Sequence, residues 1–294
     1  MAGLIDVRIV NAFIDGAAGG NPAGVVVDAN GLTPAQKQAA AERVGLSETA
    51  FVSESRSATF KLEFFTPLRQ IAHCGHATIA TFSLLRELGM IGEGLMSKET
   101  IDGNRDILIE GDMAFMEQRS PRYDDVPAES ELGRRALSSL GLKAEQLLDG
   151  QIACVVNTGN SFLLIPVEDE TALRTITPKL QEIAAVSEEL GLIGYYVFCR
   201  ATKRPGRAAG TRMFAPRFGI AEEAGTGMAA GPLACFLHDR LGVPDIALLI
   251  EQGWFMPTPS PSVIKVNLEI KGSRISRLMA GGRAKATSSM KVEV

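Results

Sequence analysis

The chain repeats its own order of segments after about 145–150 residues. "TPAQKQAAAERVG" (33–45) returns as "TPKLQEIAAVSEELG" (177–191), and "LEFFTP" (62–67) returns as "TRMFAP" (211–216). Last, "HCGHATIATFSLLRELG" (73–89) is matched by "EEAGTGMAAGPLACFLHDRLG" (222–242). Solenoid repeats have periods of about 20–50 residues, so a period this long indicates duplicated domains. The alternative is two ordinary α+β domains that share common turn sequences.

The chain is long enough for two domains, since about 100–200 residues per domain is usual. The polar, proline-containing segment "EQRSPRYDDVPAESE" (117–131) is the kind of sequence in which domain boundaries fall. We therefore predict an N-terminal domain over 1–120 and a C-terminal domain over 121–294. The last strand, at about 280–294, is a candidate to pack back onto the first domain.

In each half, small residues lead into an apolar helix, at 75–89 and at 225–242. We expect the first of each matched helix pair, 33–45 and 177–191, to open at its Thr-Pro. A helix N-terminus presents unpaired N–H groups and a partial positive charge. If two related halves face each other, two such ends converge on one spot. The pattern thus predicts an anion site, most simply for a substrate carboxylate.

Composition narrows the classes of function. A net charge of −4 and few aromatic residues give no reason to expect nucleic acid or a membrane surface as partner. No apolar run reaches the length of about 18 residues that a transmembrane helix needs, and the first residues do not read as a signal peptide. The four cysteines lie far apart, so we expect no disulfide framework and a cytoplasmic location.

The stretch "HCGH" admits three interpretations. His73, Cys74 and His76 are too close in sequence for a tetrahedral zinc site, whose ligands come as separated pairs, so we expect no metal. Cys74 precedes a predicted helix, where a lowered pKa would make it a usable thiolate, or it is a small buried filler under a tight turn. His76, at the helix start, is expected to be neutral and able to exchange a proton, or simply to cap or pack.

Longer stretches resemble the phenazine-biosynthesis PhzF-like family. They are "VRIVNAFIDGAAGGNPAGVVVDANGLTPAQKQAAAERVGLSETAFV", "FFTPLRQIAHCGHATIATF", "MFAPRFGIAEEAGTGMAAGPLA" and "EQGWFMPTPS", in order along nearly the whole chain. The resemblance implies the diaminopimelate epimerase fold, of class α+β. In it, two pseudo-symmetric domains each wrap a barrel-like sheet around a central helix, and the active site lies in the cleft between them.

The resemblance also implies roles for particular residues. The catalytic carboxylate falls on Glu48 in "SET", and His76 and Glu223 assist the proton transfer or orient the substrate. The substrate carboxylate would be bound by the helix-start amides of Gly75, His76, Gly227 and Met228. Asn21 in "GGNP" would shape the wall beside Glu48, and Cys74 and Thr226 would complete the substrate-binding set.

The implied activity is isomerisation by a proton shift between two carbons of a small carboxylate-bearing molecule. It needs no cofactor and no metal, and the family resemblance implies a homodimer. The chain departs from the family pattern at Glu223, where Asp is usual, and at Met228, where Ser is usual. The lost hydroxyl and the longer carboxylate argue against the phenazine precursor itself as substrate.

Two other functions stay open. "CGH" also resembles the first half-site of proline racemases and hydroxyproline epimerases, which use one thiol on each side of the substrate carbon. Ala224 stands where they have the second Cys, so paired-thiol racemisation is excluded. An epimerase or dehydratase that uses Cys74 remains, as does a catalytically inactive homologue that binds a metabolite or a partner.

Overall fold

The computed structural model describes residues 3–294, and the chain divides into two compact units. Unit 1 ends at Glu117 and also includes Gly281–Val294, and unit 2 is Gln118–Ala280. Two strands, β8 (Met113–Arg119) and β17 (Arg274–Glu293), run from one unit into the other. Among the described residues, no helix has the length and apolar character needed to cross a membrane.

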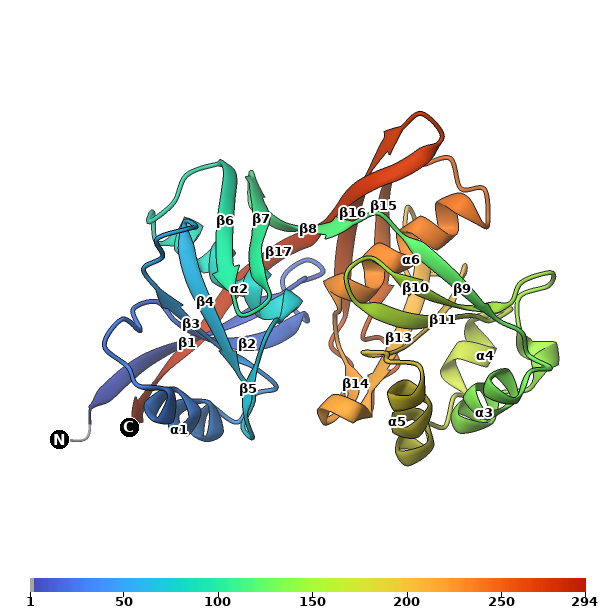
Figure 1. Cartoon of the computed structure of the whole chain (residues 1–294), viewed down its shortest axis with the longest axis horizontal. Coiled ribbons are helices and arrows are strands. Elements are labelled where there is room, and N and C mark those ends of the chain that lie inside the picture. The colour runs from blue at the N-terminus through green and yellow to red at the C-terminus, as the bar shows by residue number, and fades with distance from the viewer. Residues whose placement is uncertain (1–2) are drawn as a thin grey trace. The chain divides into compact units, whose positions relative to one another are not determined.

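Unit 1 begins with a hairpin and contains two helices, α1 (Pro34–Val44) and α2 (Gly75–Glu87). Of these, α2 lies among the strands and α1 outside them (Figure 1). Besides β8 and β17, its strands are β1 (Leu4–Ala12), β2 (Asn21–Val26), β3 (Thr49–Ser53), β4 (Phe60–Phe65), β5 (Gln70–Ile71), β6 (Gly94–Thr100) and β7 (Gly103–Glu110).

The sheet of unit 1 is mixed and closes on itself. The strand β2 lies parallel to β3 and β4 lies parallel to β6, and α1 and α2 are the respective crossover connections. The pairs β1–β2, β3–β4, β6–β7 and β7–β8 are antiparallel. Because β17 pairs with both β1 and β8, the ring of strands is complete.

Unit 2 contains the remaining elements. Its helices are α3 (Glu131–Leu140), α4 (Glu170–Arg174), α5 (Leu180–Glu189) and α6 (Gly227–Asp239), with short 3₁₀ turns at Ala144–Gln146 and Pro216–Phe218. Its strands are β9 (Arg122–Val126), β10 (Ala153–Asn157), β11 (Ser161–Pro166), β12 (Gly194–Cys199), β13 (Ala209–Ala215), β14 (Ile220–Glu223), β15 (Ala247–Gln252) and β16 (Ser262–Lys271).

The order of strand pairings in unit 2 repeats that of unit 1. An antiparallel pair, β10–β11, is followed by a parallel pair, β11–β12, whose connection contains α4 and α5. The antiparallel pair β12–β13 comes next, and β13 is parallel to β15 with α6 as the crossover. The duplicated α+β architecture predicted from the sequence is confirmed.

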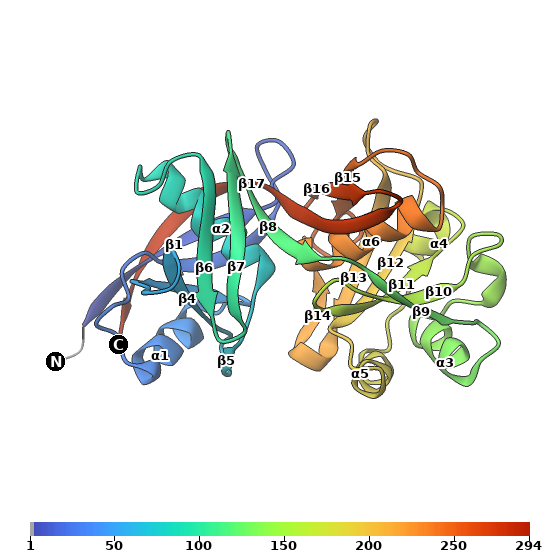
Figure 2. The same cartoon turned by 45° about the horizontal axis from the view of Figure 1, so that its top comes forward.

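One helix is central to each unit. Figures 1 and 2 show α2 among the strands of unit 1 and α6 among those of unit 2. Both helices are buried on nearly every side, and α2 packs on β1, β2 and β3 while α6 packs on β10, β11 and β16. Because both helices are surrounded by the core of their unit, neither needs a polar face toward solvent.

The first helix of each repeat starts differently. In α1, Thr33 forms a capping box with Gln36, and Pro34 occupies the first helical position, as predicted. The expectation that Thr177-Pro178 opens the matching helix is wrong, because α5 begins at Leu180. The N–H of Thr177 donates to the carbonyl of Leu140 at 3.0 Å, at the end of α3, which holds this segment out of the helix.

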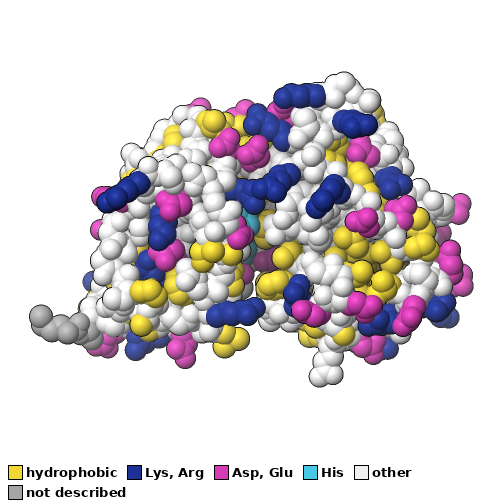
Figure 3. Space-filling view, viewed as in Figure 1, with side chains coloured by type: hydrophobic (Ala, Val, Ile, Leu, Met, Phe, Trp, Pro, Cys, Tyr) yellow, Lys and Arg dark blue, Asp and Glu magenta, His cyan; other side chains and the backbone are white. Residues whose placement is uncertain are grey.

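The surface carries both signs of charge. Figure 3 shows Lys and Arg side chains interspersed with Asp and Glu on the face in view. This mixture agrees with the small net charge of −4. It resembles the surface of an ordinary globular protein more than a nucleic-acid-binding face.

Candidate active site

Three of the predicted site residues meet in unit 1. The imidazole of His76 lies between a thiol and a carboxylate: its Nδ1 is 3.6 Å from the Sγ of Cys74, and its Nε2 is 3.3 Å from Oε2 of Glu48. Glu48 is 5% exposed and His76 is 4% exposed. Cys74 is the N-cap residue of α2, His76 lies in its first turn, and Glu48 directly precedes β3.

Burial controls the protonation of Cys74. Removal from water raises the pKa of the Cys74 thiol, and the carboxylate of Glu48 raises it further, while His76 acts in the opposite direction. Of the two interpretations of Cys74, a usable thiolate or a small buried residue, the raised pKa favours the buried residue. Cys74 is a protonated thiol at neutral pH.

A protonated thiol at Cys74 determines which ring nitrogen of His76 carries the proton. A thiol next to Nδ1 can donate its proton there only if that nitrogen is the acceptor, which leaves the ring proton on Nε2. Nε2 is the nitrogen that faces Glu48. The arrangement thus places three groups that can exchange protons in a row, from Cys74 through His76 to Glu48.

The same three residues are also the group best able to hold a metal ion. One ligand atom of each lies within 4.8 Å of the others. However, the two contacts of His76 use opposite nitrogens of one ring, and a metal ion binds only one nitrogen of an imidazole. The observed contacts therefore suit proton transfer along a line better than convergence on one ion.

The backbone around Glu48 is held closely by β2. The N–H of Gly24 donates to the carbonyl of Glu48 at 3.0 Å, and Gly24 is in register with Thr49. A Cβ on Gly24 would come within 2.8 Å of the hydroxyl of Thr49, so a larger residue would displace β3. Asn21 is buried at the start of β2, on the same strand.

The predicted residues of the second half lie together in unit 2. Glu223 ends β14, and Thr226 is the N-cap residue of α6. The hydroxyl of Thr226 donates to the carboxylate of Glu223 in a short hydrogen bond, and both side chains are buried. The helix α6 begins at Gly227 and α2 begins at Gly75. The residue of the second half that corresponds to Cys74 by its position at the helix start is therefore Thr226, and not Ala224 as the sequence alignment indicated.

Gln252 fixes this second group and was not predicted. Its side-chain amide donates to the carbonyl of Glu223 at 2.7 Å and to the hydroxyl of Thr226 at 3.0 Å. Its oxygen accepts from the N–H of Thr226 and from the hydroxyl of Tyr196, each at 3.0 Å. Since the N–H of Thr226 is engaged, anion binding at α6 is left to the amides further along the helix.

The start of α6 has two further neighbours. Gln118 donates to the carbonyl of Gly227 at 2.9 Å and itself accepts from the hydroxyl of Thr158 at 2.7 Å. The side-chain amide of Asn160 lies 3.4 Å from the sulfur of Met228. Gln118, Thr158 and Asn160 were not predicted, because none of them belongs to a motif.

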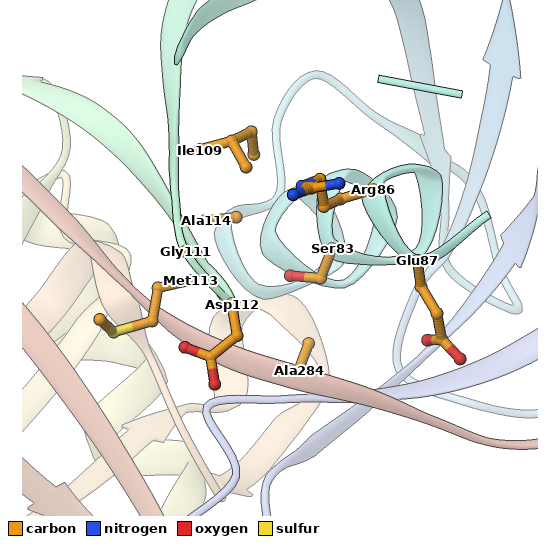
Figure 4. A pocket seen from close by; sticks show the side chains of 9 residues that line it. All are labelled: Ser83, Arg86, Glu87, Ile109, Gly111, Asp112, Met113, Ala114 and Ala284. Carbon is orange, nitrogen blue, oxygen red and sulfur yellow. The ribbon is translucent and has the colours of Figure 1, made fainter. Parts of the chain in front are cut away.

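A cavity of about 420 Å³ lies elsewhere on α2. In Figure 4, the hydroxyl of Ser83 and the guanidinium of Arg86 extend from α2 toward β8 and the turn at Gly111 and Asp112. These side chains come from the second half of the helix, two or three turns beyond His76. The cavity contains none of the predicted site residues.

Comparison with known proteins agrees with this fold. The family model described as "Phenazine biosynthesis-like protein" matches residues 10–290. The chain is similar to an uncharacterized isomerase of Deinococcus radiodurans, at 32% identity over 94% of this chain and 90% of that protein. It is also similar to the uncharacterized isomerase YddE of Escherichia coli O157:H7, at 30% identity over 94% of both.

Solved structures give the same result. A PhzF-family protein of Bacillus anthracis matches with a TM-score of 0.88 and 26% identity, over 99% of this chain and 100% of that one. A hydroxyproline epimerase of Agrobacterium vitis matches with a TM-score of 0.62 and 13% identity, over 99% of this chain and 93% of that one, and shows the fold alone.

The fold is that of the PhzF-family and epimerase-like proteins. The chain belongs to the PhzC–PhzF family of phenazine biosynthesis-like proteins. The resemblance found in the sequence, and the fold class that it implied, are confirmed. At the level of the family, the protein is an isomerase.

Proposed function

We propose that the protein isomerises a small carboxylate-bearing substrate by moving a proton between two of its carbons, with no cofactor. Glu48 removes the proton and returns it. His76 orients the carboxylate and stabilises its ionised form, and Glu223 assists in the same reaction as the family resemblance implies. The helix-start amides of α2 bind the substrate carboxylate.

One observation carries this proposal: Glu48 is buried, and its carboxylate lies 3.3 Å from a ring nitrogen of His76. A carboxylate removed from water near a single nitrogen base is a strong acceptor of a C–H proton and retains it for return to the substrate. A surface glutamate would exchange such a proton with water. The buried position therefore favours transfer within the substrate over loss to solvent.

Exchange with deuterium oxide tests the proposal. The purified protein is incubated in deuterium oxide with a panel of small carboxylates that carry an acidic C–H, and each is followed by proton NMR. We expect one class of substrate to be isomerised and to gain deuterium more slowly than it is isomerised, because the buried carboxyl seldom exchanges its proton with solvent. Glu48→Gln should reduce the rate of isomerisation at least about a hundredfold because it removes the base. Glu63→Gln, a change in another carboxylate of unit 1, is the control for folding.

A second candidate function rests on Cys74, which contacts the other nitrogen of His76. In an epimerase or dehydratase of this kind, the thiol would transfer the proton. Cys74→Ser separates the two: it leaves the rate of isomerisation within about tenfold if Glu48 is the base, and abolishes isomerisation if the thiol is. Isomerisation that survives Glu48→Gln but not Cys74→Ser would overturn the proposal, and absence of isomerisation by the wild type and every variant would favour a binding protein.

A further inference from the structure

Unit 1 contains a lysine that the proposed reaction does not use. Lys98, on β6, is 0% exposed, and within the part of the chain that the structure describes no carboxylate forms an ion pair with it. Its ammonium lies 5.1 Å from the ring centre of Phe64, within range of a cation–π interaction. A buried ammonium without a counterion is costly, so its retention calls for a function.

The contacts of Lys98 all lead to the turn before α2. Its Nζ donates to the hydroxyl of Thr78 at 2.6 Å and lies 3.1 Å from Nδ1 of His73. The hydroxyl of Thr78 in turn donates to the carbonyl of Cys74 at 2.6 Å. A relay of two hydrogen bonds thus connects the buried charge with the peptide between Cys74 and Gly75.

That peptide carries the first amide of the predicted anion site. The carbonyl of Cys74 and the N–H of Gly75 belong to one planar, trans group, so fixing the carbonyl also fixes the direction of the N–H. A positive charge at the carbonyl end draws electron density through the group and strengthens the N–H as a donor. The local dipole of α2 acts in the same sense.

We propose that Lys98 is a positioning residue that, through Thr78, orients and polarises the Cys74–Gly75 peptide and so strengthens anion binding at the start of α2. The inference rests on the proposed function in one respect, because it takes this helix start as the place where a carboxylate binds. It assigns a role to a residue that touches neither the substrate nor the proton line of His76.

His73 supplies an independent consequence. When Lys98 is protonated it can only donate, so Nδ1 of His73 then accepts from Lys98 and the ring proton is on Nε2. Burial, followed by the charges of Lys98 and Arg105, lowers the pKa of His73 well below 6.5. The titratable and charged groups around Lys98 are His73, Cys74, Arg105 and Asp102, the last in the turn that follows β6.

The test compares two threonines of α2. Thr78→Val removes the relay, and Thr81→Val is the matched control, because Thr81 is equally buried and its hydroxyl donates to the carbonyl of Ala77 without contacting Lys98. Propanoate is titrated into the ¹⁵N-labelled full chain, and the amide signal of Gly75 is followed. We expect Thr78→Val and Lys98→Met to weaken propanoate binding at least about fivefold, and Thr81→Val to leave it unchanged.

Histidine NMR provides the second readout, and the chain has only three histidines. In Lys98→Met, the pKa of His73 should rise by at least about one pH unit, because a nearby positive charge is lost. Lys37→Met removes another buried lysine, one paired with Glu63, and should leave His73 unchanged. If Lys98→Met does not fold, the pair of threonine variants still decides the question.

The outcomes separate the two proposals. Equal binding of propanoate by the wild type and Thr78→Val, or an unchanged His73 in folded Lys98→Met, would overturn the role of Lys98 and leave the proposed reaction intact. A wild-type Gly75 amide that does not respond to propanoate would overturn the carboxylate site itself, and with it this inference. The rate of isomerisation then shows whether Glu48 still catalyses proton transfer.

Discussion

At the scale of single residues, the main feature is that one imidazole, that of His76, lies between two acidic groups. His76 contacts a thiol through one nitrogen and a carboxylate through the other. Its tautomer therefore depends on which of the two holds a proton. This coupling makes the protonation of Cys74 relevant to Glu48 even if sulfur never touches the substrate.

The thiol of Cys74 should remain protonated at neutral pH, since burial raises its pKa. Burial also raises the pKa of Cys199 to about 11 and that of Cys154 to about 12. We expect the absorbance of thiolate at 240 nm to be absent at pH 7 and to appear only in the alkaline range. A thiolate step near pH 7 that disappears in Cys74→Ala would contradict this expectation.

Lys98 makes stability depend on pH. Burial lowers its pKa from 10.5 to about 7, so between these values the unfolded chain binds more protons than the folded one. Stability should therefore rise with pH from about 7 to 10.5, by a few kcal/mol for this group. Urea denaturation at several pH values measures it. Lys98→Met should flatten the dependence, and a slope equal to that of the wild type would contradict the assignment.

These residues also mark the limit of what the sequence can predict. Glu48 and His76 were identified through family motifs, and the structure brings them together. Lys98 lies in an alternating strand, where a lysine ordinarily faces solvent, and only the packing of β6 on α2 reveals its burial. The sequence left open whether Cys74 is a usable thiolate or a small buried residue, because a helix start is visible in the sequence whereas desolvation is not.

At the scale of elements, α2 and α6 are alike as helices and differ in how their starts are held. The turn before α2 is supported by Lys98 and Thr78, and the turn before α6 by the side chain of Gln252. Both helices were predicted from the sequence, but the side chains that hold the turns before them were not. Supports of this kind come from strands distant in sequence, so no local pattern indicates them.

Replacement of Gln252 by Leu should destabilise the protein by about 3 kcal/mol, because it leaves the N–H of Thr226, the carbonyl of Glu223 and the hydroxyl of Tyr196 without this partner in a buried setting. Urea denaturation gives the value, and hydrogen exchange at Thr226 locates the effect. Gln38→Leu, at a half-buried glutamine of α1, should cost about 1 kcal/mol. Equal losses in the two variants would argue against a special role for Gln252.

Helix ends show the same division between local and distant causes. Thr33 caps α1 as its sequence predicts, since the capping box needs only nearby residues. The same Thr-Pro pair at Thr177 fails to open α5 because the backbone of α3 binds it first. Identical local signals therefore have different outcomes when a neighbouring element offers a partner.

At the scale of the whole molecule, unit 2 is one continuous stretch of sequence, whereas unit 1 combines the first part of the chain with its last residues. The last strand, β17, leaves unit 2 and supplies unit 1 with the partner of β1. The duplication could be predicted from the sequence because matched segments recur in order. The last strand was also a candidate to pack onto the first domain, but no local pattern in the sequence indicates that its partner is β1.

The C-terminal strand should accordingly be essential to the stability of unit 1. Val292 is buried opposite Ile5, in a core cluster with Val7 and Val26. Val292→Asp places an unpaired charge in that cluster, so we expect a loss of about 3 kcal/mol or more, whereas Lys291→Asp on the exposed face should change stability by less than about 1 kcal/mol. Thermal denaturation compares the two, and equal midpoints would contradict the pairing of β1 with β17.

The ring of His76 has one further consequence. Because the thiol of Cys74 lies at one edge of the ring and the carboxylate of Glu48 at the other, unit 1 holds two chemically different acids next to the same imidazole. A descendant of this enzyme could change which of them meets a new substrate without rebuilding a strand or a helix. A change from a reaction catalysed by the carboxylate to one catalysed by the thiol would then need only a change in where the substrate binds.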